Sequence, residues 1–237
     1  MMLTVVARVY AEPVVLGRGE IYARLVTEVD LGRSKHARPL SYAPDVWFGL
    51  TNALTLGVIH SNTSVDRIDA GSSFCVRERA SSCSGIYRGS GIDVRLKWTP
   101  HVAWHARALL RDIDPVKPAV TVGALLRWTR GRYLLESDPY LRVGLGNREA
   151  GNRDALVVPI WIGRRLGDRV ELAIHTGIDG DLAVWRDGWH IPIGVRIEFT
   201  PARAIALGIE GGFTSAGGPQ NTSDRRAIGV FAAWHAR

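Results

Sequence analysis

The segment Gly19–Leu31, with the sequence GEIYARLVTEVDL, alternates apolar and polar side chains with a period of two. Successive side chains of an extended strand point to opposite faces. One face carries Ile21, Ala23, Leu25, Thr27, Val29 and Leu31, and the other carries Glu20, Tyr22, Arg24, Glu28 and Asp30. This pattern predicts a strand whose apolar face is covered either by a second layer of protein or by lipid.

Similar segments recur from Glu20 to the C-terminus and give about twelve strands, whereas segments of helical period are missing. Short turns, with the sequences TNA, TPHVA, RG, RRLGD and TPAR, alternate with longer polar loops. The longer loops lie around residues 32–41, 62–87, 112–118, 147–153, 178–188 and 214–226. This alternation predicts an all-β fold, an antiparallel up-and-down barrel with short turns at one rim, and is not typical of a Greek-key sandwich.

The barrel is expected to cover residues 20–237, after an N-terminal segment at residues 1–19. An even number of strands puts both termini at the short-turn rim, which is the periplasmic side in membrane barrels. The long alternating segment at residues 132–146 requires a bulge or a break near Glu136–Pro139. The first residues lack the basic region and cleavage site of an intact signal peptide.

Composition excludes some classes and leaves others open. No run of about 18 apolar residues is present, which excludes a transmembrane helix, but a membrane-spanning strand needs only about 9–11 alternating residues. The net charge of +7 permits contacts with anionic lipid, nucleic acid or anionic solutes and selects none of them. Cys75 and Cys83 lie in a polar loop and favour a disulfide in an oxidising compartment, with two free thiols as the alternative.

Two arguments favour lipid over protein as the cover of the apolar face. Twelve strands spaced about 4.8 Å apart close to a backbone diameter of roughly 24 Å, which one layer of aliphatic side chains does not fill. Aromatic residues also gather at strand ends, as expected for belts at the two membrane boundaries. These predicted girdle residues are Trp98, Trp104, Trp128, Phe199 and Trp234 near the short turns or the C-terminus, and Trp189 and Phe213 near the long loops. Trp47 and Trp161 lie nearer mid-strand and depart from this pattern.

From Glu20 to the C-terminus, the alternating strands, the rhythm of turns and loops and the aromatic strand ends resemble the outer-membrane β-barrel proteins of Gram-negative bacteria. The resemblance is one of architecture, without a diagnostic short motif. It departs from many members at the ending WHAR, where three residues follow Trp234. It implies a transmembrane β-barrel in the bacterial outer membrane, with outer-membrane lipid and lipopolysaccharide as partners.

With lipid outside, the polar face of each strand lines the interior. The predicted pore-lining residues are Arg24, Asp45, Asp93, Arg95, Lys97, Arg107, Arg127, Arg142, Glu171, Arg196, Glu198 and Glu210. Four consecutive strands supply the basic residues of a predicted wall with some anion preference, which are Arg95 and Lys97, Arg107, Arg127 and Arg142. Many inward glycines and alanines favour a water-filled, porin-like passage for small hydrophilic solutes over a plug of salt bridges.

Other functions are weighed against this channel. His60-Ser61 is similar to the His and Ser motif of outer-membrane lipid hydrolases, but adjacent residues of a regular strand point oppositely, so the motif needs a bulge or Ser64 instead. A closed structural or adhesion barrel would act through its loops, such as the cysteine loop or Trp185–Trp189. Inward His105, His175 and His190 lie on different strands and are interpreted as polar groups of the lumen. We therefore expect no catalytic residue, metal ion or cofactor, and no nucleic-acid partner.

Overall fold

The computed structural model describes residues 13–31, 40–60, 74–75, 90–113, 115–219 and 221–237. Its strands are β1 (Ile21–Asp30), β2 (Leu40–Gly49), β3 (Leu54–Ile59), β4 (Phe74–Cys75), β5 (Ser90–Thr99), β6 (Val102–Ile113), β7 (Val116–Arg130), β8 (Tyr133–Ser137), β9 (Tyr140–Gly144), β10 (Ala155–Arg165), β11 (Val170–Asp181), β12 (Trp189–Ala202), β13 (Ile205–Gly217) and β14 (Thr222–Ala236). A 3-10 turn, η2 (Leu182–Val184), and a short helix, α1 (Trp185–Gly188), join β11 to β12. No helix in the described ranges is long and apolar enough to cross a membrane.

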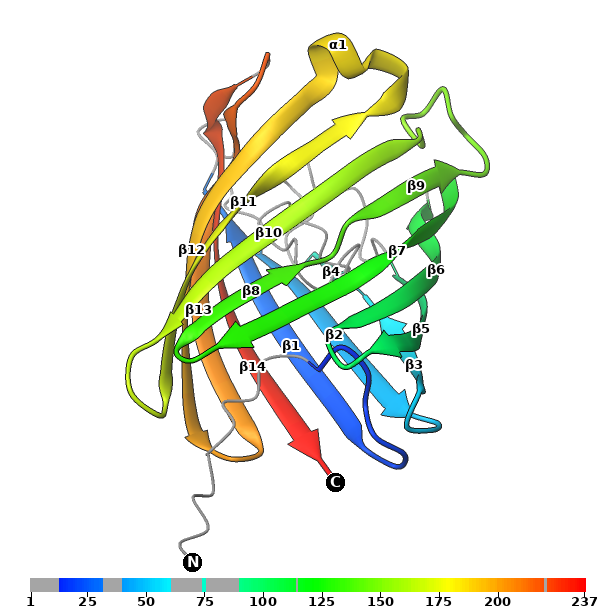
Figure 1. Ribbon diagram of the computed structural model, residues 1–237. Coiled ribbons are helices and arrows are strands. Elements are labelled where there is room, and N and C mark those ends of the chain that lie inside the picture. The colour runs from blue at the N-terminus through cyan, green and yellow to red at the C-terminus, as the bar shows by residue number, and fades with distance from the viewer. Residues whose placement is uncertain (1–12, 32–39, 61–73, 76–89, 114, 220) are drawn as a thin grey trace, which may run out of the picture.

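The strands form one antiparallel sheet that closes on itself, because β1 pairs with both β14 and β2 (Figure 1). β8 and β9 pair with the same neighbours, β7 and β10, and act as one barrel strand interrupted at Asp138–Pro139. β4 pairs with Ser41 and Tyr42 near the start of β2, on the side of β2 opposite to β1. The described barrel therefore has twelve strands, and both the predicted architecture and the predicted break are confirmed.

The alternation of side chains explains which face is turned outward. In β1, Leu25 is 46% exposed on the outer surface, while Arg24 and Val26 are buried inside the barrel. The same division holds along the other strands, where large aliphatic residues such as Val58 and Ile174 cover the outside. Soluble barrels place these residues in their core, so the outer surface is the one expected to meet lipid.

Short turns and longer connections lie at opposite rims. Connections at residues 50–53, 100–101, 131–132, 166–169 and 203–204 gather at one end, together with the C-terminus, and α1 lies at the other end (Figure 1). Gly131 has a φ of 60°, which a tight two-residue hairpin between β7 and β8 requires and glycine adopts without strain. The alternation of short turns and longer connections predicted from the sequence is thus present, with the short turns at one rim.

Two of the expected long loops are mostly strand. β6 and β7 are joined through residues 114–115 instead of 112–118, and β13 and β14 through residues 218–221 instead of 214–226. These stretches are polar and carry no apolar alternation, so the sequence pattern indicates a loop. The hairpins nevertheless continue in backbone pairing beyond the apolar band, because a ladder of hydrogen bonds needs no apolar face.

Candidate functional site

The interior of the barrel carries a network of charged side chains on β5, β6 and the β8–β9 break. The Arg107 guanidinium donates from Nη2 to Asp138 Oδ2 at 2.6 Å, and its Nε lies 3.4 Å from Asp93 Oδ1. Arg95 donates from Nε to the other oxygen of Asp93 at 2.7 Å, and His105 Nε2 lies 2.7 Å from Asp138 Oδ1. All five side chains are at most 2% exposed. Mutual pairing is what compensates the loss of hydration of these charges.

The tryptophans that depart from the girdle pattern belong to this interior. Trp47 donates from Nε1 to Asp93 at 2.8 Å, and the Arg95 guanidinium lies 4.6 Å from the centre of its ring. Trp161 stacks on His175 at 4.4 Å between ring centres and is almost fully buried. An indole offers both an apolar face and one N–H donor, which suits a packed polar interior.

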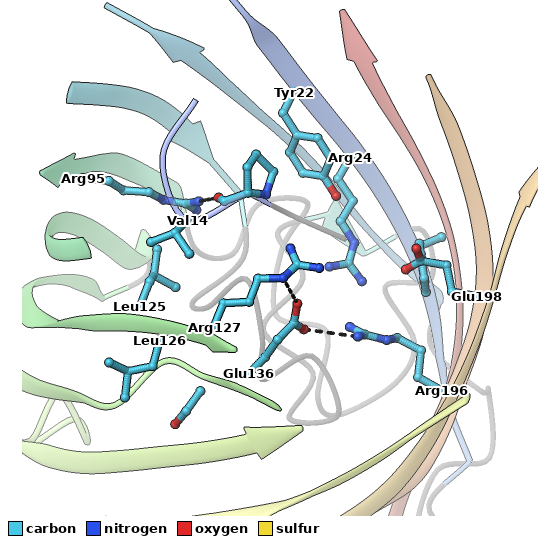
Figure 2. Close-up of a pocket in the computed structure, with 13 residues that line it drawn as sticks. Val14, Tyr22, Arg24, Arg95, Leu125, Leu126, Arg127, Glu136, Arg196 and Glu198 are labelled. Carbon is cyan, nitrogen blue, oxygen red and sulfur yellow. Dashed lines mark hydrogen bonds and ion pairs between the residues drawn. The ribbon is translucent and has the colours of Figure 1, made fainter. Parts of the chain in front are cut away.

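A second network reaches between distant strands. Glu136 of β8 lies 3.2 Å from Arg127 Nε and 3.3 Å from Arg196 Nη2 (Figure 2). Because β10 and β11 separate β8 from β12 in the wall, the pair between Glu136 and Arg196 crosses part of the lumen. Arg196 also lies 3.6 Å from Glu171 of β11. This network therefore occupies part of the lumen between β7, β8 and β12.

A small cavity of about 30 Å³ remains beside the second network (Figure 2). Its lining consists of Pro13, Val14, Tyr22, Arg24, Arg95, Leu125, Leu126, Arg127, Glu136, Ser137, Arg196, Glu198 and Phe231. Four arginines thus face two glutamates there. The volume is enough for about two water molecules, so this part of the interior is constricted.

The segment that precedes β1 contributes to the constriction. Leu16 is 2% exposed and packs against Tyr22 and Trp47 inside the barrel. Its amide donates to Thr55 Oγ1 at 2.8 Å, and the carbonyl of Pro13 lies 3.4 Å from Arg95 Nη1. The described part of the predicted N-terminal segment therefore folds back into the lumen at the short-turn rim, and the periplasmic position of residues 1–19 stays a prediction.

The predicted pore-lining residues fall into three groups. Nine of them are buried on the interior face, namely Arg24, Asp45, Asp93, Arg95, Arg107, Glu171, Arg196, Glu198 and Glu210. Arg127 is half-buried in the second network, Lys97 is exposed near the short-turn rim, and Arg142 is half-buried toward the other end. Their role in lining a passage stays a prediction, because the structure gives their positions alone.

Sequence reasoning missed Glu136, Asp138 and the interior tryptophans as members of this site. Strand alternation could have found Glu136, because its neighbour Leu135 is turned outward. Asp138 carries no such signal, since it lies outside β8 and β9 and its orientation depends on the break.

The inward glycines do not leave empty space, which corrects the inference drawn from them. A Cβ on Gly57 would lie 2.3 Å from Trp47 Cδ1, and one on Gly208 would lie 2.2 Å from the Phe231 ring. Small residues therefore make room for large side chains of neighbouring strands. Their presence does not by itself favour an open passage over a filled one.

The predicted girdle residues lie on the outer surface or at its edge. Trp98 and Trp104 stack at 5.5 Å between ring centres, and Trp128 stacks on His101 at 6.4 Å, all beside short turns. Phe199, Phe213 and Trp234 are exposed on the outside, and Trp189 is half-buried at the start of β12. Whether they contact a membrane boundary stays a prediction.

Residues considered for other chemistry are dispersed. His60 donates from its amide to Asp45 Oδ1 at 2.6 Å, and its ring contacts the Pro44 carbonyl. Ser61, Ser64 and Cys83 lie outside the described residues, so the His and Ser motif and the disulfide of Cys75 stay predictions. His105 contacts Asp138, His175 stacks on Trp161, and His190 lies 3.6 Å from Asp179, so the three histidines do not meet.

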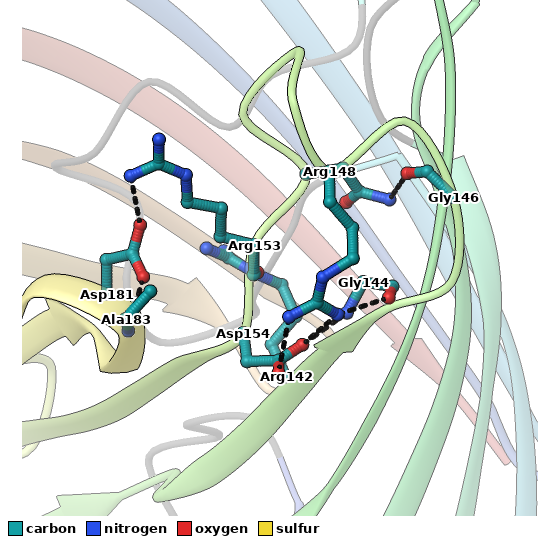
Figure 3. A network of polar contacts seen from close by, with 9 residues as sticks. Arg142, Gly144, Gly146, Arg148, Arg153, Asp154, Asp181 and Ala183 are labelled. Atoms are coloured by element: carbon teal, nitrogen blue, oxygen red, sulfur yellow. Dashed lines mark hydrogen bonds and ion pairs between the residues drawn. The ribbon is translucent and has the colours of Figure 1, made fainter.

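A separate polar network stabilises the connections at the long-loop rim (Figure 3). Arg148 donates from both Nη atoms to the carboxylate of Asp154, at 2.9 and 2.8 Å, and the Gly144 amide donates to the same carboxylate at 3.0 Å. These hydrogen bonds hold the pKa of Asp154 below its usual value. Arg153 Nη1 lies 3.3 Å from Asp181, which links this connection to the end of β11.

No protein-family model and no curated protein matches the chain. Among solved structures, an outer-membrane channel from Pseudomonas putida F1 is 11% identical, with 96% of this chain and 99% of that chain covered and a TM-score of 0.56. The KdgM porin is 8% identical, with 90% and 98% covered and a TM-score of 0.49. Omp33 of Acinetobacter baumannii is 7% identical, with 92% and 98% covered and a TM-score of 0.47. The chain has the fold of outer-membrane β-barrel proteins, and the resemblance drawn from the sequence is confirmed.

Proposed function

We propose that the protein is a channel of the bacterial outer membrane that passes small hydrophilic solutes by diffusion through a narrow, charged lumen. The observation that carries this proposal is the division of the wall into an apolar outside and an ionic inside. Buried ion pairs stabilise a fold no better than apolar packing does. An interior built from ion pairs therefore indicates that these charges serve a function in the lumen, because apolar side chains would stabilise the barrel equally well. The likeness to the Pseudomonas putida channel supports the fold on which this proposal rests.

Planar-bilayer conductance of the refolded full chain tests the channel. Small, steady conductance steps are expected, because the network at Glu136 and Arg196 and the segment at Leu16 narrow the lumen. Insertion is verified separately by protection from protease in vesicles. An inserted protein that leaves the bilayer silent would contradict the proposal.

We also propose some preference for anions, with three of the arginines that line the cavity, Arg24, Arg127 and Arg196, as its support. The wall at Arg95 and Arg107 contributes less than the sequence indicates, because Asp93 and Asp138 pair with it. Arg127→Gln should shift the reversal potential in a salt gradient toward cation selectivity. Arg203→Gln, which removes the same charge from an exposed turn, is the matched control, and equal shifts in both variants would contradict the preference.

A closed structural or adhesion barrel is the second candidate. Two observations favour it, the ion pair between Glu136 and Arg196, which crosses part of the lumen, and the packing of Leu16 inside the barrel. This candidate predicts no conductance in either the parent protein or a variant with a loosened interior. The conductance experiment therefore separates the two candidates.

A further inference from the structure

We propose that Arg130, Tyr133 and Arg164 form a binding site for the phosphate of an anionic glycerophospholipid on the outer surface of the short-turn rim. The site rests on the proposed membrane location and does not depend on whether the barrel conducts. Its residues belong to three neighbouring strands, β7, β8 and β10, and play no part in the interior networks.

The register of the sheet puts the three residues in one row. Tyr133 pairs with Arg130 on one side and with Arg164 on the other. Two positions further into each strand lie Trp128, Leu135 and Ile162, which are 43%, 40% and 54% exposed on the outside. Since side chains two residues apart share a face, the row points outward as well. The row of Arg130, Tyr133 and Arg164 lies two residues nearer the turns than the girdle residue Trp128, at the level where the hydrocarbon core of a membrane meets the lipid headgroups.

The side chains are arranged around the middle of this row. The Arg164 guanidinium lies 5.8 Å from the centre of the Tyr133 ring and so leans toward the strand of Arg130. With neighbouring strands about 4.8 Å apart, the two arginine Cα atoms lie about 10 Å from each other. Two long arginine side chains can bridge that distance to one phosphate, and the planar guanidinium binds phosphate oxygens in pairs. The Tyr133 hydroxyl adds a donor between them.

The charges of the row are not neutralised by the protein. In the described part of the chain, neither Arg130 nor Arg164 has a carboxylate within ion-pair distance, whereas Arg165, next to Arg164, is paired with Glu171. All three residues of the row are exposed, and Tyr133 is 60% exposed. The adjoining turns add Arg132 and Arg169 against a single acid, Asp168. An anionic headgroup is the partner that supplies the missing negative charge at this depth.

Native mass spectrometry of the refolded protein with phosphatidylglycerol, and with phosphatidylcholine as the zwitterionic reference, tests the site. The variant Arg130→Gln/Arg164→Gln should bind phosphatidylglycerol on the order of tenfold more weakly, with binding of phosphatidylcholine little changed. The control Arg18→Gln/Arg203→Gln removes the same charge from exposed positions at the same rim and should retain binding.

Equal phosphatidylglycerol binding in the two double variants would overturn the site, because it would reduce the effect to the overall charge of the rim. Unchanged binding in Arg130→Gln/Arg164→Gln would overturn it outright. Both positions are exposed, so folding is expected to survive, and the shift between folded and heated protein on a gel verifies it. A silent bilayer together with selective lipid binding would contradict the channel and leave this site standing.

Discussion

Asp138 lies in the break between β8 and β9, where its carboxylate meets Arg107 and His105 among almost fully buried side chains. Asp138→Asn leaves Asp93 as the remaining carboxylate partner of Arg107 in the described part of the chain, and should lower the free energy of unfolding by about 3–5 kcal/mol, as broken buried ion pairs do. Urea unfolding in lipid vesicles measures this loss. Asp168→Asn on an exposed turn is the control, with an expected change within about 0.5 kcal/mol, and equal losses would contradict the buried network.

For a single residue, the sequence predicts the face of the barrel wall on which the side chain lies, but not the charged group with which it pairs. Alternation places Arg95 and Arg107 inside because every second residue of a strand shares a face. The pairing of Arg107 with Asp93 and Asp138 depends on strand register and on the geometry of the break, and Arg107 and Asp138 are 31 residues apart in sequence. The predicted basic wall therefore carries paired acids at Arg95 and Arg107, and its role in anion preference stays a prediction.

The segment before β1 occupies part of the lumen, where the side chain of Leu16 anchors it. Leu16→Asp places a carboxylate in the apolar contacts with Tyr22 and Trp47, which should expel the segment and enlarge the single-channel conductance. Leu182→Asp, an equal change at an exposed position of η2, should leave conductance unchanged. Identical conductance in the parent and the Leu16 variant would remove the segment from the passage.

The connection at residues 145–154 is expected to respond to acid. Because hydrogen bonds from Arg148 and the Gly144 amide lower the pKa of Asp154, its carboxylate stabilises the connection above the usual value of 3.8, and that contribution is lost as the pH falls through the lowered pKa. Hydrogen exchange of this peptide, corrected for the chemical exchange rate, should show protection that is constant from about pH 5 to 7 and falls below about pH 3.8.

Asp154→Asn is the control for the acid response, and its exchange protection should no longer depend on pH in that range. Protection that falls equally in the variant and the parent would show that another group titrates there.

The bounds of an element could be predicted where a residue type by itself restricts the local backbone structure. Pro139 cannot donate a ladder hydrogen bond, so the break beside it could be read from the sequence. The extension of β6 and β7 toward each other could not, because Lys117 and its neighbours have the composition of a loop and their pairing is decided by the partner strand. The inward fold of Pro13–Leu16 also leaves no local signal.

For the whole molecule, closure into twelve strands followed from the period of two and the alternation of turn lengths. The openness of the lumen did not follow, because the space above Gly57 and Gly208 belongs to Trp47 and Phe231 on neighbouring strands. Whether a small residue leaves empty space can be judged only when the side chains on the neighbouring strands are known. The lumen is therefore narrower than the number of strands alone indicates.

Quenching of tryptophan fluorescence by lipids with bromine-labelled acyl chains tests directly whether hydrocarbon surrounds the apolar outer wall. Trp104 is 49% exposed on the outside, and Trp161 is enclosed in the interior. In vesicles, Trp104→Phe should reduce the quenchable part of the fluorescence, and Trp161→Phe should reduce only the part that bromine does not reach. Loss of quenchable fluorescence in Trp161→Phe but not in Trp104→Phe would mean that the faces are reversed and that this wall does not meet lipid.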